Sequence, residues 1–286
     1  VEFVADIEQI QKSMSASYLS EEELIDIAKT LRTSRLVKKF LMENLELTAF
    51  LRNGAQSLIS DRELEEKIFS TFDENLNIKQ DATPTLKGLY SALRDNEKNL
   101  KTTVSSLMNS PEFSKHLQEN IYTTRDDRIV FQVMASSKSK VPGIVHDVSA
   151  TNKTFYIEPA QIVPLNNKIR EIKAGIHAEL IKILVDLTVF VKAKMREISH
   201  SEKVLAAIDY QFAKARYAVK IQAVEPEIIT EKFVDIENMH HPLLVGNVEN
   251  VVSNNFEIGK DYKSVIITGS NTGGKTVTLK TIGLFI

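Results

Sequence analysis

The chain has 286 residues, of which 43% are hydrophobic and 26% are charged, and its formal net charge is −2. These proportions are typical of a globular protein of roughly one to three domains, and they exclude a disordered or fibrous chain. A near-neutral charge gives no general attraction to nucleic acid, so any such binding must come from local patches or from shape.

A helix is predicted over residues 20–51. Ser20 stands three residues before Glu23, which is the spacing of a capping box, and apolar residues then recur at helical intervals. A further helix is predicted to begin at Asp61, and residues 75–82 are polar enough to form a connection after it.

A long helix is predicted to begin after this connection. Thr83 suits its N-cap and Pro84 suits its first turn, where the missing N–H group has no intrahelical partner to lose. Leucine and valine residues then recur every three or four positions. Asn109, Ser110 and Pro111 are expected to end or interrupt the helix.

Residues 118–168 are predicted to form a small β-rich insertion. The runs IVFQV, GIVHDV and TFYIEP are short and separated by serine, lysine, glycine and asparagine. Helical periodicity returns over residues 165–223, with an expected break at residues 199–201, where Ser-His-Ser resembles a new cap. The two long helices are expected to bury their apolar stripes against each other as an antiparallel arm, rather than against a ligand.

The pattern changes again after Pro226, so a new domain is predicted over residues 225–286. The runs KFVDI, PLLVG and YKSVIITG are β-like, and residues 265–267 are expected to form an apolar strand that enters a glycine-rich loop. Val277, Leu279 and Ile282 suit a helix that leaves the loop. The predicted fold class is therefore mainly α with a small β insertion, followed by the start of an α/β P-loop domain.

The loop itself is predicted to bind phosphate, because it fits G-x-x-x-x-G-K-[ST] without a mismatch. Its members are Gly269, Ser270, Asn271, Thr272, Gly273, Gly274, Lys275 and Thr276. The alternative is a glycine-rich strand-to-helix turn that binds no nucleotide. Lysine and threonine in this register favour the phosphate-binding loop.

ATP and Mg²⁺ are the cofactors that this loop predicts. Backbone N–H groups and a helix N-terminus converge on phosphate oxygens, and glycine lets the backbone approach them. Lys275 is expected to neutralise the β- and γ-phosphates, and Thr276 to offer its hydroxyl to Mg²⁺. Hydrolysis also needs an acid on another strand, and only ten residues follow Thr276. We therefore predict no steady ATP hydrolysis by these residues alone.

Other chemistry finds little support. Cysteine is absent and the six histidines form no zinc-binding pattern. Arg125 and Arg128 bracket Asp126 and Asp127, and the four are expected to form surface ion pairs rather than a catalytic pair. No apolar run approaches the roughly 20 residues that span a bilayer, and no signal peptide is evident. We therefore expect a cytoplasmic protein without membrane contact.

The order of the parts resembles that of the MutS2 family, in which a helical arm, a β tip and a returning arm precede the phosphate-binding loop. Coiled-coil ATPases of the chromosome-maintenance type instead place the loop before the coil. Four segments carry the resemblance: TGSNTGGKTVTLKTIGL, KVPGIVHDVSATNKTFYIEP, IVPLNNKIRE and HHPLL. Ser270 stands where the family usually has proline, and His240 stands where it usually has arginine.

The resemblance implies a division into four parts. Residues 1–117 and 169–224 would be the two halves of a lever, residues 118–168 a clamp, and residues 225–286 the beginning of a MutS-type P-loop ATPase domain. The ATPase would be completed by further sequence.

Roles for residues outside the loop are also implied by the resemblance. His241 and Val251 would lie near the adenine of the nucleotide, although a role in the core suits them equally well. Lys138, Lys140 and Lys153 would contact nucleic-acid phosphates at the clamp tip. The alternative is that these lysines are only solvated.

The implied function is that of an ATP-driven homodimeric clamp that acts on branched DNA and limits recombination, without mismatch recognition. ATP would lie between two subunits, and a small nuclease-like domain would usually follow the ATPase. One alternative is a quality-control factor that engages collided ribosomes, and hence ribosomal RNA. A second alternative is an inert structural fragment without activity.

Overall fold

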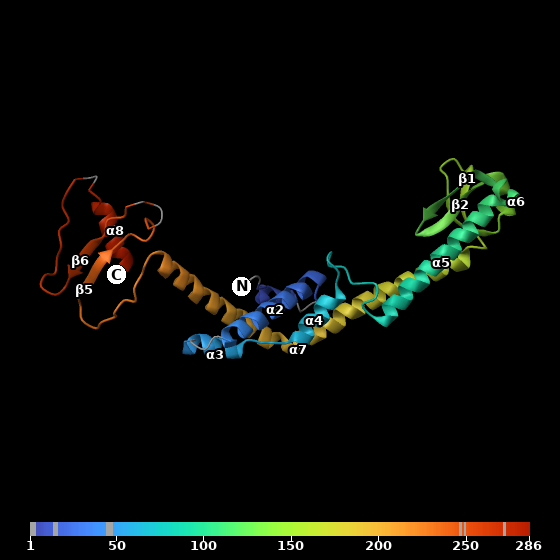
Figure 1. The fold of residues 1–286 in the computed structure, drawn as a ribbon. Coiled ribbons are helices and arrows are strands. Elements are labelled where there is room, and N and C mark those ends of the chain that lie inside the picture. Colours follow the sequence, from blue (N-terminus) through green and yellow to red (C-terminus); the bar gives the residue numbers. More distant parts are fainter. Residues whose placement is uncertain (1–3, 14–16, 44–47, 246–247, 249, 271–272) are drawn as a thin grey trace. The chain divides into compact units, whose positions relative to one another are not determined.

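The computed structural model describes residues 4–13, 17–43, 48–245, 248, 250–270 and 273–286 (Figure 1). The chain forms two compact units, Val1–Leu205 and Ala206–Ile286. As predicted, it is mainly helical with a small antiparallel sheet. None of the helices in the described ranges is long and apolar enough to cross a membrane.

Helices make up most of the first unit. They are α1 (Ile7–Ser13), α2 (Glu21–Glu43), α3 (Ala49–Ser57), α4 (Arg62–Thr71), α5 (Pro84–Asn109), α6 (Pro111–Ser114) and most of α7 (Val163–Lys220). Ser20 and Glu23 form the predicted capping box, with amide-to-side-chain distances of 2.8 and 3.2 Å. Asp61 and Thr83 each accept an amide hydrogen bond of 3.0 Å from the helix that follows them. The predicted starts of α4 and α5 are therefore confirmed.

The prediction of one helix over residues 20–51 holds as far as Glu43 and is wrong in joining that helix to Ala49. α2 ends at Glu43 and α3 begins at Ala49, while residues 44–47 lie outside the described residues. The Thr48 hydroxyl accepts a hydrogen bond of 3.4 Å from the Leu51 amide and caps α3. An N-cap residue has a non-helical backbone, so Thr48 cannot continue the preceding helix.

The helix α7 is continuous over 58 residues, so the predicted break at residues 199–201 is wrong. Ser201 is fully buried, and its hydroxyl accepts a hydrogen bond of 2.8 Å from the Ile59 amide. The serine therefore holds the connection between α3 and α4 instead of capping a new helix.

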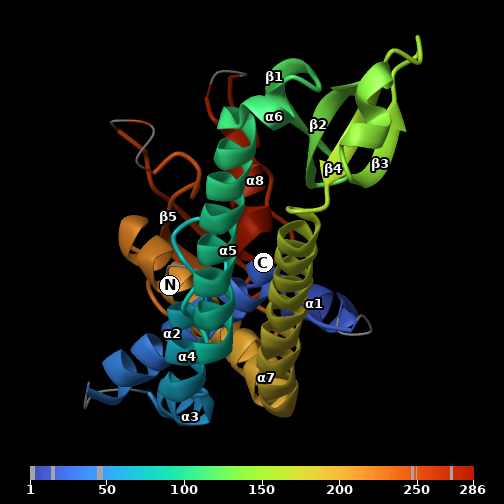
Figure 2. The ribbon, with the colours of Figure 1, turned by 90° about the vertical axis from the view of Figure 1, so that its right-hand side faces the viewer.

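The antiparallel arm is formed by α5 and α7, which lie side by side in both views (Figures 1 and 2). Leu86 of α5 is buried together with Ile172 and Ile176 of α7 and with apolar residues of α2 and α4. The prediction that the two long helices bury their stripes against each other is confirmed.

A buried ionic contact joins α2 to α4. Glu65 is 3% exposed and accepts hydrogen bonds of 2.8 Å from Arg35 Nε and 3.2 Å from Arg32 Nε. Burial alone would raise the pKa of Glu65, but the hydrogen bonds from the two arginines outweigh it and hold the pKa below its ordinary value. The carboxylate is therefore ionised at neutral pH.

Four antiparallel strands interrupt the arm. They are β1 (Leu117–Arg125), β2 (Arg128–Met134), β3 (Gly143–Val148) and β4 (Thr154–Pro159), in the order β1-β2-β4-β3. The last three contain the predicted runs, whereas the sequence pattern does not predict β1, whose residues are mostly exposed. Phe131, Val133 and Ile157 form a second core with Leu100 of α5 and Ile169 of α7. The sheet therefore rests on the arm.

The second unit holds the C-terminal end of α7, the antiparallel pair β5 (Val234–Met239) and β6 (Asn254–Ile258), and α8 (Lys275–Phe285). The predicted helix after the loop is confirmed. The strand predicted over residues 265–267 is wrong, since these residues form no strand and Ile266 is 87% exposed. A strand needs hydrogen-bonded neighbours, and β5 and β6 pair with each other instead. In the PLLVG run, residues 242–244 form a turn and Val245 forms an isolated bridge with Val248.

Candidate nucleotide loop and nucleic-acid surface

The glycine-rich loop places two glycines in backbone conformations that other residues rarely adopt. Gly269 has φ +148° and Gly274, the N-cap of α8, has φ +77°. A Cβ at either position would meet no atom within 4 Å, so the backbone angle and not crowding selects glycine. Asn271 and Thr272, both predicted members of the loop, lie outside the described residues.

The Lys275 side chain folds back over the loop. Its ammonium donates hydrogen bonds to the carbonyl oxygens of Gly269 and Ser270, the latter at 2.6 Å. The Gly273 amide donates to the Ser270 carbonyl at 3.1 Å. These contacts bring both ends of the predicted motif around one positive charge.

The donor set of the loop fits a nucleotide phosphate. α8 begins at Lys275, so the amides of its first turn have no intrahelical acceptor. The helix dipole favours an anion at the same end. The Thr276 hydroxyl is exposed and makes no hydrogen bond within the described ranges of the chain, which leaves it available to Mg²⁺. These groups would hold the phosphates, and bound Mg²⁺ would offset their charge.

His241 has a local structural role. Its Nδ1 accepts a hydrogen bond of 3.3 Å from the Leu243 amide, and its carbonyl oxygen accepts one of 2.9 Å from the Leu244 amide. These bonds fix the turn that follows it. The role of His241 and Val251 near adenine stays a prediction.

The three predicted phosphate-binding lysines lie on two segments that meet where β2 ends. Lys138 and Lys140 lie in the 3-10 helix η1 (Ala135–Lys140), and Lys153 lies in the turn between β3 and β4. The Ala135 amide donates to the Lys153 carbonyl at 3.0 Å, which joins the two segments. All three lysine side chains are exposed, and Lys138 Nζ lies 4.5 Å from the centre of the Phe155 ring.

A fourth lysine, Lys115, belongs to the same end of the sheet. The Met134 amide donates to the His116 carbonyl at 3.0 Å, and His116 Nδ1 lies 3.1 Å from the Ser137 hydroxyl of η1. The sequence does not single out Lys115, because only the pairing of β1 with β2 brings this lysine to η1. We call Lys115, Lys138, Lys140 and Lys153 the basic end.

The opposite end of the sheet is held by a buried carboxylate. Glu158 is 0% exposed and contacts Arg128 at 3.0 and 3.1 Å, His146 Nε2 at 2.6 Å and Asn166 Nδ2 at 2.8 Å. These partners come from β2, β3 and α7, while Glu158 itself is on β4. We call these four residues the Glu158 cluster. It fixes the sheet to the start of α7.

The prediction that the two arginines at residues 125 and 128 pair with the two aspartates between them is wrong. Arg128 contacts Glu158, and Arg125 Nε lies 3.4 Å from Asp147. Asp126 and Asp127 both have positive φ and form the turn between β1 and β2. That geometry suits aspartate in a tight hairpin and points to a role in the turn.

Comparison with known proteins finds relatives named Endonuclease MutS2. The chain is 36% identical to the protein of Alkaliphilus metalliredigens over 284 residues, which are 98% of this chain and 36% of the relative. It is 32% identical to the protein of Clostridioides difficile over 289 aligned positions, which cover 100% of this chain and 36% of the relative. For Bacillus cereus the identity is 35% over 281 residues, 97% of this chain and 35% of the relative. The chain thus spans about a third of the length of these relatives. No protein-family model matches it.

Proposed function

We propose that the chain forms the lever, the clamp and the first part of the ATPase of a dimeric protein that closes around branched DNA. This proposal starts from the fact that the chain belongs to the MutS2 family over the segment that it shares with these relatives. The clamp would limit recombination and would respond to ATP. One arrangement carries the proposal: a helical arm that bears a basic sheet end is followed in the chain by a phosphate-binding sequence at the start of α8.

ATP binding is supported by the loop. Lys275 and the first-turn amides of α8 are suited to donate to nucleotide phosphates, and the Thr276 hydroxyl oxygen is suited to coordinate Mg²⁺. ATP hydrolysis and DNA cleavage are proposed for the whole protein, in keeping with the name of the relatives. A cytoplasmic location is part of the same proposal.

Nucleic-acid binding is supported by the basic end. Four exposed lysines on two turns and a short helix present positive charge, but no helix or strand among these described segments is shaped to enter a DNA groove. This pattern suits contact with phosphates and recognition of the shape of a nucleic acid, rather than recognition of its base sequence. Branched DNA is a substrate of that kind. The proposal therefore includes no mismatch recognition.

The test is ultraviolet crosslinking of the full-length protein in cells, with wild type beside Lys275→Ala and with sequencing of both bound DNA and bound RNA. We expect branched chromosomal sites whose enrichment depends on Lys275. Enrichment of ribosomal RNA in place of DNA would refute the DNA proposal and move the basic end to collided ribosomes. Crosslinking that does not change in Lys275→Ala would refute control by ATP.

A further inference from the structure

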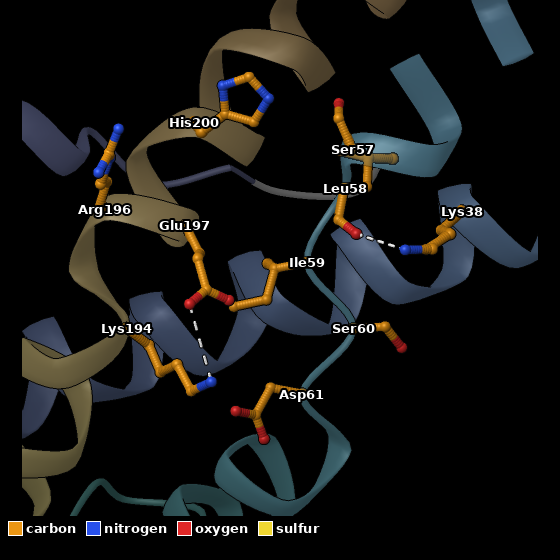
Figure 3. A pocket seen from close by; sticks show the side chains of 10 residues that line it. All are labelled: Lys38, Ser57, Leu58, Ile59, Ser60, Asp61, Lys194, Arg196, Glu197 and His200. Atoms are coloured by element: carbon orange, nitrogen blue, oxygen red, sulfur yellow. Dashed lines mark hydrogen bonds and ion pairs between the residues drawn. The ribbon is translucent and has the colours of Figure 1, made fainter. Parts of the chain in front are cut away.

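A hollow of about 670 Å³ lies in the first unit, and its lining shares no residue with the glycine-rich loop or the basic end. Figure 3 shows it between α7 and the connection from Ser57 to Asp61, with Lys38 of α2 beside that connection. This volume is within the range of small-ligand sites in proteins, roughly 300–1,000 Å³.

The wall opposite α7 is held rigidly in place. The Ile59 carbonyl accepts a hydrogen bond of 2.7 Å from the Ser34 hydroxyl, and the Ile59 amide donates one of 2.8 Å to the Ser201 hydroxyl. Both serines are fully buried. Lys38 Nζ donates to the Leu58 carbonyl at 2.8 Å. The hollow is thus preformed, and a ligand would not have to order this segment.

The acidic side chains of the hollow are already engaged. The Asp61 carboxylate accepts the Leu64 amide at 3.0 Å and caps α4. Glu197 lies 3.8 Å from Lys194 Nζ in a loose ion pair. Both carboxylates keep their negative charge, but the three positive charges of Lys38, Lys194 and Arg196 in the same lining outnumber these two.

Two basic side chains of the hollow have no such partner. Arg196 and His200 lie one turn apart on α7, both are exposed, and neither makes a hydrogen bond or ion pair within the ranges that the structure describes. Lys38 adds its positive charge from the other side, with its hydrogen bonds directed to carbonyl oxygens. The hollow consequently has unpaired donors for an anion and an excess of positive charge.

We propose that this hollow binds a small soluble anion that carries a phosphate group, held by Arg196 and His200 and attracted by Lys38 and Lys194. Phosphate is favoured because a guanidinium offers it two parallel hydrogen bonds and an imidazole one turn away offers a third. The volume exceeds that of a bare phosphate, so the ligand is a phosphate ester or a diphosphate. Bound there, it would link the α3–α4 connection to α7.

The test uses the full chain with Lys275→Ala, which removes the phosphate affinity of the glycine-rich loop. Inorganic pyrophosphate is the probe, and isothermal titration calorimetry measures its binding. We expect binding in the Lys275→Ala chain and a loss of about tenfold or more when Arg196→Gln and His200→Gln are added. Lys182→Gln, an exposed α7 lysine outside the hollow and several turns from Arg196, is the matched control and should leave the affinity unchanged.

Three outcomes would overturn the proposal. One is pyrophosphate binding that disappears with Lys275→Ala alone, which assigns all of it to the loop. Another is an equal loss in the Lys182→Gln control. The third is that a single-stranded DNA of about 12 nucleotides binds through Arg196 and His200 while pyrophosphate does not, which makes the hollow part of a nucleic-acid path.

A second measurement does not depend on the folding of the Arg196 and His200 variants. In the Lys275→Ala chain with isotope-labelled histidine, the His200 ring resonances should shift on addition of pyrophosphate, while those of the other histidines stay in place. Unchanged His200 resonances at saturating pyrophosphate would also refute the proposal.

Discussion

Replacing Glu158 by glutamine should loosen the sheet from the arm. The carboxylate is fully buried and Arg128 is only 14% exposed, so the pair is shielded from water. Glutamine keeps the shape but presents an NH₂ group to donors, and it leaves the Arg128 charge without a counter-ion. Removing one partner of a buried ion pair costs about 3–5 kcal/mol, and we expect a cost near the lower limit because Arg128 also donates to Asn167 at 2.6 Å.

The assay is urea unfolding followed by circular dichroism, together with hydrogen exchange of the amides of β3 and β4. The control is Asp147→Asn, which removes a longer ion pair whose side chains are 40% and 52% exposed. An exposed pair of this kind contributes about 0–1 kcal/mol. Equal effects of the two substitutions on the free energy of unfolding would refute this role of Glu158, as would unchanged exchange of β3 and β4 in Glu158→Gln.

Three further predictions concern other parts of the chain. Glu65→Gln should lower the melting temperature at neutral pH. Because the pKa of Glu65 is depressed in the fold, its contribution is complete above about pH 4.3, the ordinary glutamate value, and is lost as pH falls through the folded pKa. The difference from wild type should therefore vanish in acid, and a difference that persists there would contradict the ionic explanation. Ser201→Ala should cost about 1–3 kcal/mol in urea unfolding because it strands the buried Ile59 amide, whereas Ser199→Ala, at a position for which the described part of the chain shows no such bond, should cost much less. Replacing the four lysines of the basic end with glutamine should weaken the salt dependence of DNA binding, measured by fluorescence anisotropy. The slope of log K against log salt concentration should become shallower by about 0.7–0.9 for each phosphate that is no longer neutralised. An unchanged slope would show that these lysines do not contact phosphate.

The helix starts could be predicted from the sequence because capping is local. Ser20 and Thr83 bond to amides three residues away, so the pattern and the contact share one short segment. Ser201 resembles a cap in the same way, yet its partner Ile59 is 142 residues distant. No local pattern distinguishes these two uses of serine, and for this reason the continuity of α7 could not be predicted.

The candidate sites also differ in whether their residues are neighbours in the sequence or are brought together only by the fold. The loop motif is contiguous, so its positive-φ glycines and the position of Lys275 at the start of α8 follow from the sequence. The basic end is assembled from three segments by antiparallel register, and Lys115 joins it only through the pairing of β1 with β2. The partner of Arg128 was also beyond prediction, since Glu158 faces it from another strand.

The two ends of the small sheet differ in how well they should tolerate amino-acid substitutions. At the Glu158 end, four side chains depend on one another, so a single replacement leaves a buried group unsatisfied and any tolerated change needs a compensating partner. At the basic end, the lysines are exposed on turns, where substitution and insertion disturb little. Relatives are therefore expected to retain the attachment to α7, and variation among them should be concentrated at the basic end.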